Sequence, residues 1–290
     1  VLIPGKFSDG DPSNNFMVRD YRLPNPKYKQ GYRGGDFAGI LKHLDHLKRL
    51  GLTAILFYPV LENDRKDFFG FLATGYRIKD FQRIDPNLGT ESDFKKLIAE
   101  FHSTSNGERM NVILDLPFTL VGAEHPWNRE PEKYKDYFRR WNAENISDNI
   151  ATNPIQASFG PIDTSWGLGI IDPTHGMKEG NGAYGYIRDE IIFWLTDRFE
   201  LDGFRYDSAQ NLPFLFWKTV LADFRKRYAD SKPGFFQVGE LFLDRKRSWQ
   251  RNFFQYLGDG KAKMMDGLYD FFTIELIQRE CTLQQQHGCP

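Results

Sequence analysis

Gly203-Phe204-Arg205-Tyr206-Asp207 is the stretch that decides the fold class of this chain. It is a short apolar run that ends in an acid, and segments with helical periodicity flank it over 187–199 and 214–228. Strand–helix alternation of this kind is typical of a parallel sheet covered by helices. The alternation recurs: we expect strands at 52–60, 111–114, 235–238 and 266–272, a helix over 40–50, and a helix opened by the capping pair Thr90 and Asp93.

Two more acids follow predicted strands directly, namely Asp115 and Glu240. The carboxyl ends of parallel barrel strands share one face, so we expect both acids to meet Asp207 there. Arg205 shares a face with Asp207, because alternate strand residues point the same way, and its fixed charge would keep that acid ionised. Two converging acids can act as the nucleophile and general acid of a retaining glycosidase, whose carboxyl groups lie roughly 5 Å apart. The alternative is a structural ion pair at a strand end.

The overall charge of the chain is close to zero. Its 290 residues carry 38 Lys and Arg against 39 Asp and Glu, which argues against nucleic acid as a partner. Hydrophobic residues make up 40%, as in ordinary globular proteins, and no apolar run is long enough for a membrane segment. Aromatic residues reach 16%, which indicates either a large core or a surface that stacks on flat ligands.

The two ends of the chain leave its compartment open. The first five residues lack the charged and apolar regions of a signal peptide, and without an initiator Met the chain resembles a processed or partial product. Cys281 and Cys289, in a polar tail over 281–290, are interpreted as two incidental thiols. Cytoplasmic and secreted locations therefore both remain open.

Taken together, the motifs resemble the α-amylase family of glycoside hydrolases (family 13), and most closely its cyclomaltodextrinase and neopullulanase types. Gly203 to Asp207 resembles the nucleophile motif of that family, and Gly239-Glu240 its general-acid motif. The other matching stretches are Gly75-Tyr76, Asp80-Phe81, Ile84-Asp85-Pro86-Asn87-Leu88-Gly89-Thr90, Asn111-Val112-Ile113-Leu114-Asp115 and Glu124-His125-Pro126-Trp127. Each motif alone is weak, but together they are specific.

The resemblance implies catalytic and substrate-binding roles. Asp207 would attack the anomeric carbon, Glu240 would protonate the leaving oxygen and then activate water, and Arg205 would orient Asp207. The implied substrate-binding residues are Tyr76, which would stack on the sugar unless it is a core tyrosine, Asp115 and His125. Trp127 and Trp166 are further candidates for sugar stacking.

A calcium loop is predicted near the amino end. The stretch from Asp9 to Asn15 is rich in side-chain oxygens and is bent by Gly10 and Pro12, which suits Ca²⁺ but not an EF-hand. By resemblance to cyclomaltodextrinases and neopullulanases, the metal ligands would be Asp9, Asp11, Asn14, Asn15, the Gly34 carbonyl and Asp36. The alternative is a plain Asx turn, with Asp36 only capping the next helix.

The sequence also departs from the family pattern. Thr119 and Leu120 replace the usual Asn-His, and Gln210 and Asn211 replace the Lys-His after the nucleophile. The His-Asp motif that supplies the third catalytic acid is absent, and we expect that acid to lie beyond residue 290.

The expected fold is α/β: an incomplete (β/α)8 TIM barrel with about six of eight strands and a loop subdomain inserted after strand 3. The predicted strands lie near Leu2, Ile55, Val112, Phe204, Phe236 and Leu268. The barrel would cover 1–121 and 186–280, the insert 122–185 and the tail 281–290.

The expected function is cleavage of α-glucosidic bonds in starch-like oligosaccharides by a retaining double-displacement mechanism, with the 290-residue piece itself expected to be inactive. The alternative is a catalytically silent relative that binds carbohydrate or a protein partner, as in the ectodomains of amino-acid-transporter heavy chains. A nucleotide-binding protein is disfavoured, because Gly167-Leu168-Gly169 does not sit between a strand and a helix. Chain length and linkage preference, hydrolysis against transglycosylation, and the oligomeric state stay open.

Overall fold

The computed structural model describes 1–15, 32–64, 74–105, 108–122, 124–130, 132–137, 162–163, 168–170, 172, 174–209, 212–241, 255–258, 263–269 and 271. The predictions for Trp166, Gln210, Asn211, Cys281, Cys289 and the 281–290 tail fall outside these residues.

The main sheet is parallel, and the order of its strands follows the order of the chain. The strands are β1 (Ala54–Phe57), β4 (Asn111–Leu116), β8 (Gly203–Tyr206), β9 (Phe236–Gly239) and β10 (Gly267–Leu268). Leu2 adds a parallel bridge to Phe57 on the outer side of β1. All six predicted strand positions are therefore occupied, and a parallel sheet in which each strand pairs with the next along the chain confirms the predicted partial barrel.

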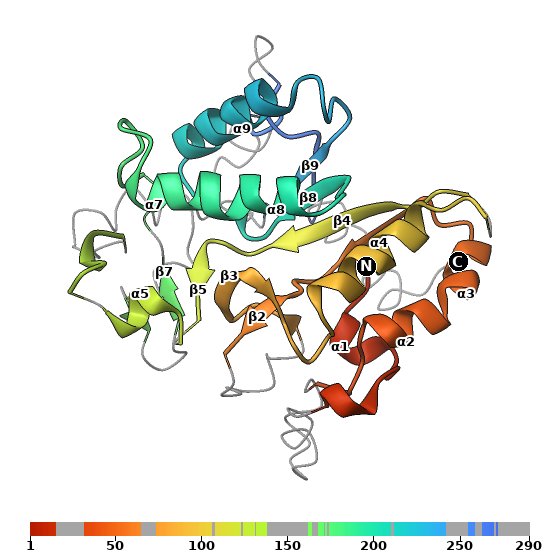
Figure 1. The fold of residues 1–290 in the computed structure, drawn as a ribbon. Coiled ribbons are helices and arrows are strands. Elements are labelled where there is room, and N and C mark those ends of the chain that lie inside the picture. Colours follow the sequence, from red (N-terminus) through yellow and green to blue (C-terminus); the bar gives the residue numbers. More distant parts are fainter. Residues whose placement is uncertain are drawn as a thin grey trace, which may run out of the picture.

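Helices connect the strands and cover the sheet. They are α2 (Phe37–Lys42), α3 (Leu44–Arg49), α4 (Glu91–His102), α7 (Gly182–Gly185), η7 (Tyr186–Phe193), α8 (Trp194–Arg198) and α9 (Phe214–Tyr228). The α7–α8 run and α9 lie beside β8 and β9, whereas α2 and α3 gather on the opposite side of the molecule (Figure 1). These helices bury the apolar faces of a sheet that cannot be stable alone.

The predicted helix boundaries are mostly confirmed. Thr90 and Asp93 form a reciprocal capping box at the start of α4. The helix expected over 40–50 is split at His43 into α2 and α3, and Gly51, with φ of 71°, follows the second. The helix expected over 187–199 begins earlier, because α7, η7 and α8 form one continuous helical run from Gly182 to Arg198, and η7 is wound as a π-helix.

Two small antiparallel sheets lie beside the main one. β2 (Leu61–Asn63) pairs with β3 (Ile78–Ile84), and β7 (Leu168–Ile170) pairs with both β5 (Leu120–Val121) and β6 (Ile162–Asp163). The short helices α5 (Pro126–Arg129) and η5 (Lys135–Tyr137) follow β5, while α1 (Pro4–Phe7) and η1 (Pro12–Asn14) lie near the amino end. The predicted boundary between residues 185 and 186 falls inside the α7–α8 run, so the end of an insert would have to precede Gly182.

Aromatic rings make up much of the core. Phe94 contacts Phe37, Phe57 and Phe199, and a second group lies under β8 and α9. The second group consists of Phe118, Tyr206, Phe216 and Trp217, all at most 1% exposed. Much of the aromatic excess therefore stabilises the barrel through buried area and edge contacts.

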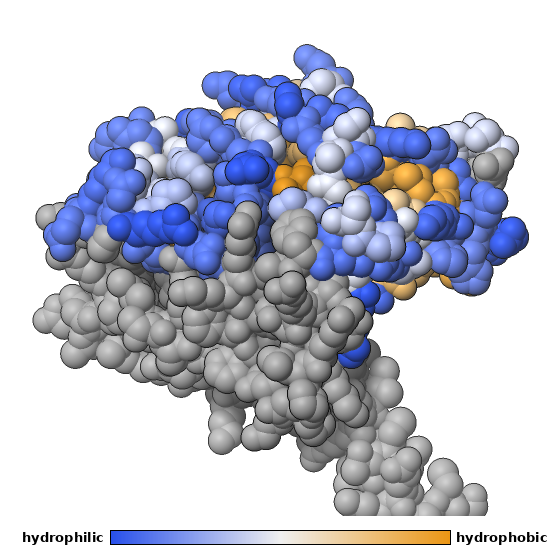
Figure 2. Space-filling view, turned by 60° about the horizontal axis from the view of Figure 1, so that its bottom comes forward, coloured by the Kyte–Doolittle hydropathy of each residue, from blue (hydrophilic) through white to orange (hydrophobic). Residues whose placement is uncertain are grey.

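The part of the surface that is coloured in Figure 2 is mainly hydrophilic, with a smaller hydrophobic area among the hydrophilic residues. Within the described part of the chain, no helix is both long and apolar enough to cross a bilayer.

Candidate active site

The strand register brings the predicted acids to one edge of the sheet. Asp115 on β4 pairs with Arg205 on β8, and Tyr206 pairs with Gly239 on β9. Asp207 and Glu240 are the next residues after β8 and β9, so both stand at the carboxyl ends of adjacent strands. In a parallel barrel this edge carries the chemistry.

Arg205 joins three carboxylates at this edge. Its Nη1 lies 2.7 Å from Oδ1 of Asp115 and 2.7 Å from Oδ1 of Asp207, and its Nη2 lies 2.7 Å from Oε2 of Glu240. Arg205 is only 5% exposed, so these contacts are made away from bulk water. A planar guanidinium with several donors can hold carboxylates in fixed relative positions, which a lysine cannot do.

The cluster carries more negative than positive charge, since three carboxylates surround one guanidinium. Burial, followed by the charge of Asp115, raises the pKa of Asp207 to about 7, although Arg205 opposes the shift. Burial also raises the pKa of Asp115. The neighbouring Glu240 adds to the rise, so the site as a whole favours a protonated Asp207 in the absence of substrate.

Tyr76 contacts this cluster through Asp115. Its hydroxyl donates a hydrogen bond to Oδ2 of Asp115 at 2.5 Å, and burial and the same acid raise its pKa. The preceding Gly75 has φ of 79°, and a Cβ there would lie 2.4 Å from the Pro59 carbonyl, so only glycine fits. The next residue, Arg77, forms a buried ion pair with Asp64, with Nη2 and Oδ2 2.9 Å apart.

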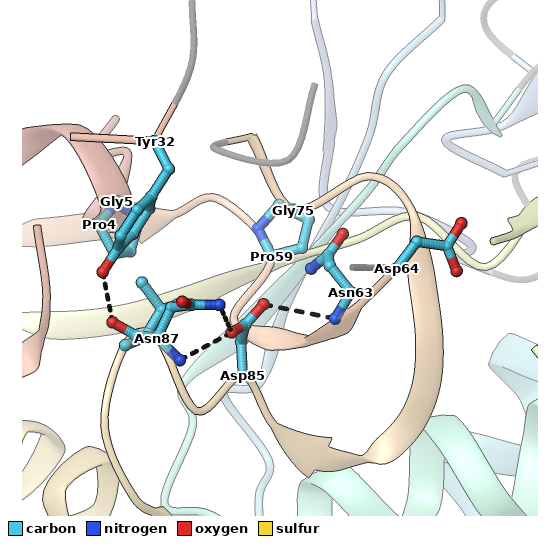
Figure 3. Close-up of a pocket in the computed structure, with 10 residues that line it drawn as sticks. Pro4, Gly5, Tyr32, Pro59, Asn63, Asp64, Gly75, Asp85 and Asn87 are labelled. Atoms are coloured by element: carbon cyan, nitrogen blue, oxygen red, sulfur yellow. Dashed lines mark hydrogen bonds between the residues drawn. The ribbon is translucent and has the colours of Figure 1, made fainter. Parts of the chain in front are cut away.

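The motif from Ile84 to Thr90 forms a hydrogen-bonded turn near Gly75. Asp85 is buried, and its carboxylate accepts hydrogen bonds from Asn63 N and from both nitrogens of Asn87. Tyr32 donates to the carbonyl of Asn87 across a cavity of ≈ 20 Å³ that Gly75 also lines (Figure 3). These hydrogen bonds give the motif a structural role beside the turn at Gly75, which precedes Tyr76.

Two residues of the site were not predicted as site residues. The ring of Tyr269, just after β10, lies 5.3 Å from the Arg205 guanidinium carbon. Ser208 donates its backbone N–H to Oε2 of Glu240 at 3.0 Å. Tyr269 could have been suspected because it lies within a predicted strand of the barrel. A contact made by the backbone, as at Ser208, leaves no signal in the pattern of side chains.

Two predicted sugar contacts are not found at the cluster. His125 is 1% exposed, caps α5 by accepting from Trp127 N, and packs against Phe81, so burial lowers its pKa to about 4. Trp127 is 3% exposed and packs among His125, Tyr134, Tyr137 and Tyr186. In this structure both rings are buried among other aromatic side chains, so the prediction that Trp127 stacks on a sugar at the surface is wrong.

Comparison with known proteins agrees with this geometry. The sequence profile of the family described as "Alpha amylase, catalytic domain" matches residues 1–169, more than half of the chain. The chain belongs to the alpha-amylase family.

Individual relatives extend the match past the profile. The intracellular maltogenic amylase of Bacillus subtilis is 26% identical over 72% of this chain and 32% of its own length. A cyclomaltodextrinase of Bacillus sp. is 26% identical over 96% of this chain, which includes Asp207 and Glu240, and 46% of its own length. The crystal structure of an Anoxybacillus alpha-amylase superposes with a TM-score of 0.68 at 27% identity, over 93% of this chain and 51% of the other. The chain thus spans less than half the length of these two curated relatives.

The predicted calcium ligands of this alpha-amylase family member lie together. Asp36 accepts hydrogen bonds at Oδ1 from Gly10 N and Gly39 N, and at Oδ2 from Asp11 N and Asn14 Nδ2. Asn15 Nδ2 donates to Asp9 Oδ2 at 2.6 Å. A Cβ on Gly34 would lie 2.9 Å from that same Asp9 oxygen, which places the Gly34 backbone beside it.

The oxygen atoms gathered here suit a hard cation such as Ca²⁺, which binds carboxylate, amide and carbonyl oxygens together. The side-chain oxygens of Asn14 and Asn15 are buried and accept no hydrogen bond, as expected for amide oxygens that serve as cation ligands. No group of three His, Cys, Asp or Glu residues is arranged for a metal in the described ranges, so amide and carbonyl oxygens would have to share the coordination. Asp36 also caps α2, as the alternative interpretation expects.

One departure from the family pattern is visible in the site. Thr119, in place of the usual Asn, is 2% exposed, and its buried Oγ1 has no hydrogen-bond partner. Its neighbour Leu120 is the first residue of β5. These positions therefore lie where β4 leads into the small sheet, close behind Asp115.

Proposed function

We propose that this protein is a retaining glycoside hydrolase that cleaves α-glucosidic bonds in starch-like oligosaccharides. The observation that carries the proposal is the bridge of Arg205 between Asp207 and Glu240, with 2.7 Å contacts to both acids. One rigid guanidinium holds a nucleophile and a general acid at adjacent strand ends, as double displacement requires. The alpha-amylase membership and the starch- and cyclodextrin-degrading relatives support the substrate class.

The geometry supports a division of roles between the two acids. Oδ1 of Asp207 is engaged by Arg205, which leaves Oδ2 to attack the anomeric carbon. As the C–O bond to the leaving sugar breaks, Glu240 gives its proton to the glycosidic oxygen. Glu240, now ionised, takes a proton from water, and the resulting hydroxide attacks the glycosyl-enzyme and frees Asp207.

The excess negative charge of the cluster favours the uptake of a proton, and burial and Asp115 raise the pKa of Asp207 to about 7. The reactive form for the first step is the one in which Glu240 carries a proton and Asp207 is charged. Arg205 and Tyr76 donate hydrogen bonds to the two oxygens of Asp115, and these contacts oppose the rise in its pKa that burial causes. In this proposal Asp115 holds Arg205 and Tyr76 in place and takes no part in proton transfer.

We also propose that the loop from Asp9 to Asn15, closed by Gly34 and Asp36, binds a structural Ca²⁺. The buried oxygens of Asn14 and Asn15 without partners support it. When bound, the ion would supply charge that ties the amino-terminal loop to the start of α2, and it has no part in the reaction.

The test of the function is hydrolysis by the intact protein. Maltooligosaccharides and cyclodextrins should release reducing ends, and the first-formed product should have the α configuration by NMR. Asp207→Asn and Glu240→Gln should each lower kcat by about 10³-fold or more, since each removes one of the two reacting acids. Asp230→Asn, an exposed residue after α9, is the matched control and should keep the parent activity.

A silent relative would give a different result. Calorimetric binding of maltoheptaose without turnover, in protein whose fold is intact by circular dichroism, would overturn the proposal. A β-configured first product would also contradict it, because that product requires an inverting mechanism.

A further inference from the structure

The backbone at Ser208 is strained. Its φ is 48°, and it is the one non-glycine residue with positive φ in the part of the chain that the structure describes. A left-handed conformation is unfavourable for a residue with a Cβ, because the Cβ comes too close to the following carbonyl oxygen. Ser208 directly follows the nucleophile Asp207, and strain kept at such a position indicates a functional constraint.

The strained turn places two successive backbone donors on Glu240. Ser208 N donates to Oε2 of the Glu240 side chain at 3.0 Å, and Ala209 N donates to the Glu240 carbonyl at 2.8 Å. Glu240 N in turn donates to the carbonyl of Tyr206 at 2.9 Å. The segment after β8 thus holds both the main chain and the side chain of the general acid.

The core holds this turn in place. Ala209 is fully buried, and its carbonyl accepts a hydrogen bond from Nε1 of Trp217 at 2.8 Å. Trp217 is fully buried on α9 and packs against Tyr206 and Phe118. The two donors are therefore fixed by buried packing and not by a free loop.

We propose that Ser208 is a positioning residue whose left-handed backbone decides which oxygen of Glu240 carries the catalytic proton. The inference rests on the proposed function, in which Glu240 is the general acid. Oε2 receives hydrogen bonds from Arg205 Nη2 and Ser208 N, and neither group can accept one. When Glu240 is protonated, its proton must therefore reside on Oε1. Because Ser208 adjoins Asp207, the same turn also sets the spacing between nucleophile and acid.

Three variants test the proposal in the intact protein. Ser208→Val disfavours positive φ, because its β-branched side chain crowds that conformation, whereas Ser208→Gly adopts it freely. Ser231→Val, at an exposed turn after α9, is the matched control for the chemical change.

The readout compares two substrates. Maltotriose needs protonation of its leaving oxygen, whereas fluoride leaves α-maltosyl fluoride with little help from an acid. For maltotriose, Ser208→Val should lower kcat by about 10²-fold or more, the usual contribution of general acid catalysis, and Ser208→Gly should recover most of that loss. For α-maltosyl fluoride, Ser208→Val should lose less than about tenfold, because nucleophilic attack by Asp207 remains. Equal losses on both substrates would overturn the proposal.

A second measurement uses no substrate. In protein labelled with ¹⁵N-serine, the Ser208 amide resonance should differ more between the parent and Glu240→Gln than between the parent and Glu200→Gln, because Glu240 accepts its hydrogen bond. A Ser208 amide resonance that is the same in the parent and in Glu240→Gln would overturn the proposal. If the protein turns over neither substrate, the proposed function fails, while the comparison of the Ser208 amide resonances still decides whether Ser208 binds Glu240.

Discussion

Tyr76 and Asp115, which are 39 residues apart in the chain, meet through a hydrogen bond of 2.5 Å from the phenol to Oδ2. The other oxygen of Asp115 binds Arg205, and Arg205 binds Asp207. A chain of charged and polar contacts therefore leads from the β2–β3 hairpin to the nucleophile. A hydrogen bond to a charged group contributes more free energy in a buried site than in water. A substitution at Tyr76 should therefore change the position of Asp207 and the catalytic rate.

Removal of the Tyr76 hydroxyl should weaken catalysis without unfolding the protein. Tyr76→Phe leaves Oδ2 of Asp115 without its donor, and we expect kcat/KM for maltotriose to fall about tenfold, the equivalent of about 1.4 kcal/mol. Tyr76→Ala also removes the ring and should lose more. Steady-state kinetics measure both, and a core tyrosine without a role in the site would give a lower melting temperature with unchanged kcat/KM.

Replacement of the nucleophile should make the protein more stable and inactive. The pKa of Asp207 is raised to about 7, above its value of about 4 in an unfolded chain, so this group contributes most stability at low pH. Its contribution is lost as pH rises from about 4 through 7. Asp207→Asn should therefore raise the melting temperature at pH 8, with a smaller gain at pH 4, at about 2–4 °C per kcal/mol.

Calorimetric melting across pH 4 to 8 measures this gain, and Glu200→Gln, whose side chain is 85% exposed, is the control. An Asp207→Asn protein that is less stable than the parent at pH 8 would show that Asp207 is stabilising as an anion, and would contradict the charge argument.

Removal of calcium should lower the melting temperature. An ion present at 100 times its Kd stabilises the folded state by about 2.7 kcal/mol, so chelation should cost several degrees. Asp9→Asn removes a charge but keeps an acceptor for Asn15, and it should abolish the calcium-dependent rise while hardly changing the melting temperature in chelator.

Two comparisons sharpen the calcium test. Asp36→Ala should be less stable even in chelator, because it also removes the cap of α2, and Asp45→Asn on the exposed side of α3 should behave as the parent. If the melting temperature of the parent protein changes with neither chelator nor added Ca²⁺, the calcium proposal is wrong and the loop is a plain Asx turn.

Asp202 should set the acid stability of the barrel. Burial opposes its ionisation, but hydrogen bonds from His102, Arg109 and Val112 N outweigh this effect and lower its pKa to about 2. A lowered pKa gives stability that is present above about pH 4 and is lost as pH falls through 2. Asp202→Asn should melt at a lower temperature at neutral pH, and the gap should narrow below pH 4. Thermal melts followed by circular dichroism at pH 2 to 7 measure the two melting temperatures. A difference between parent and variant that stays constant over this range would contradict an origin in the lowered pKa of Asp202.

Patterns within a few residues were enough for the strands and for the first contacts of the site. The runs before Asp115, Asp207 and Glu240 fix three neighbouring parallel strands, since each run is apolar and too short for a helix. The capping pair Thr90 and Asp93 fixes the start of α4, because both hydrogen bonds are local. Arg205 was predictable in the same way, as its side chain shares a face with Asp207 through the two-residue period of a strand.

The remaining features depend on contacts between distant segments. His125 and Trp127 matched a motif, but only the packing of α5 against β3 and η7 shows that their rings are buried. Tyr269 reaches Arg205 only because β10 pairs with β9. Ser208 has no unusual composition around it, and its role follows from a φ angle that depends on Glu240 and Trp217.

The sequence by itself therefore determined the parallel strand order, the family and the three acids with their arginine, because strand period and short motifs are local properties. The tertiary structure decided which oxygen atoms face Arg205, that burial raises the pKa of Asp207, and that a strained turn holds Glu240. Those properties depend on burial and on distances of about 3 Å between segments far apart in the chain, and only the packed barrel sets them.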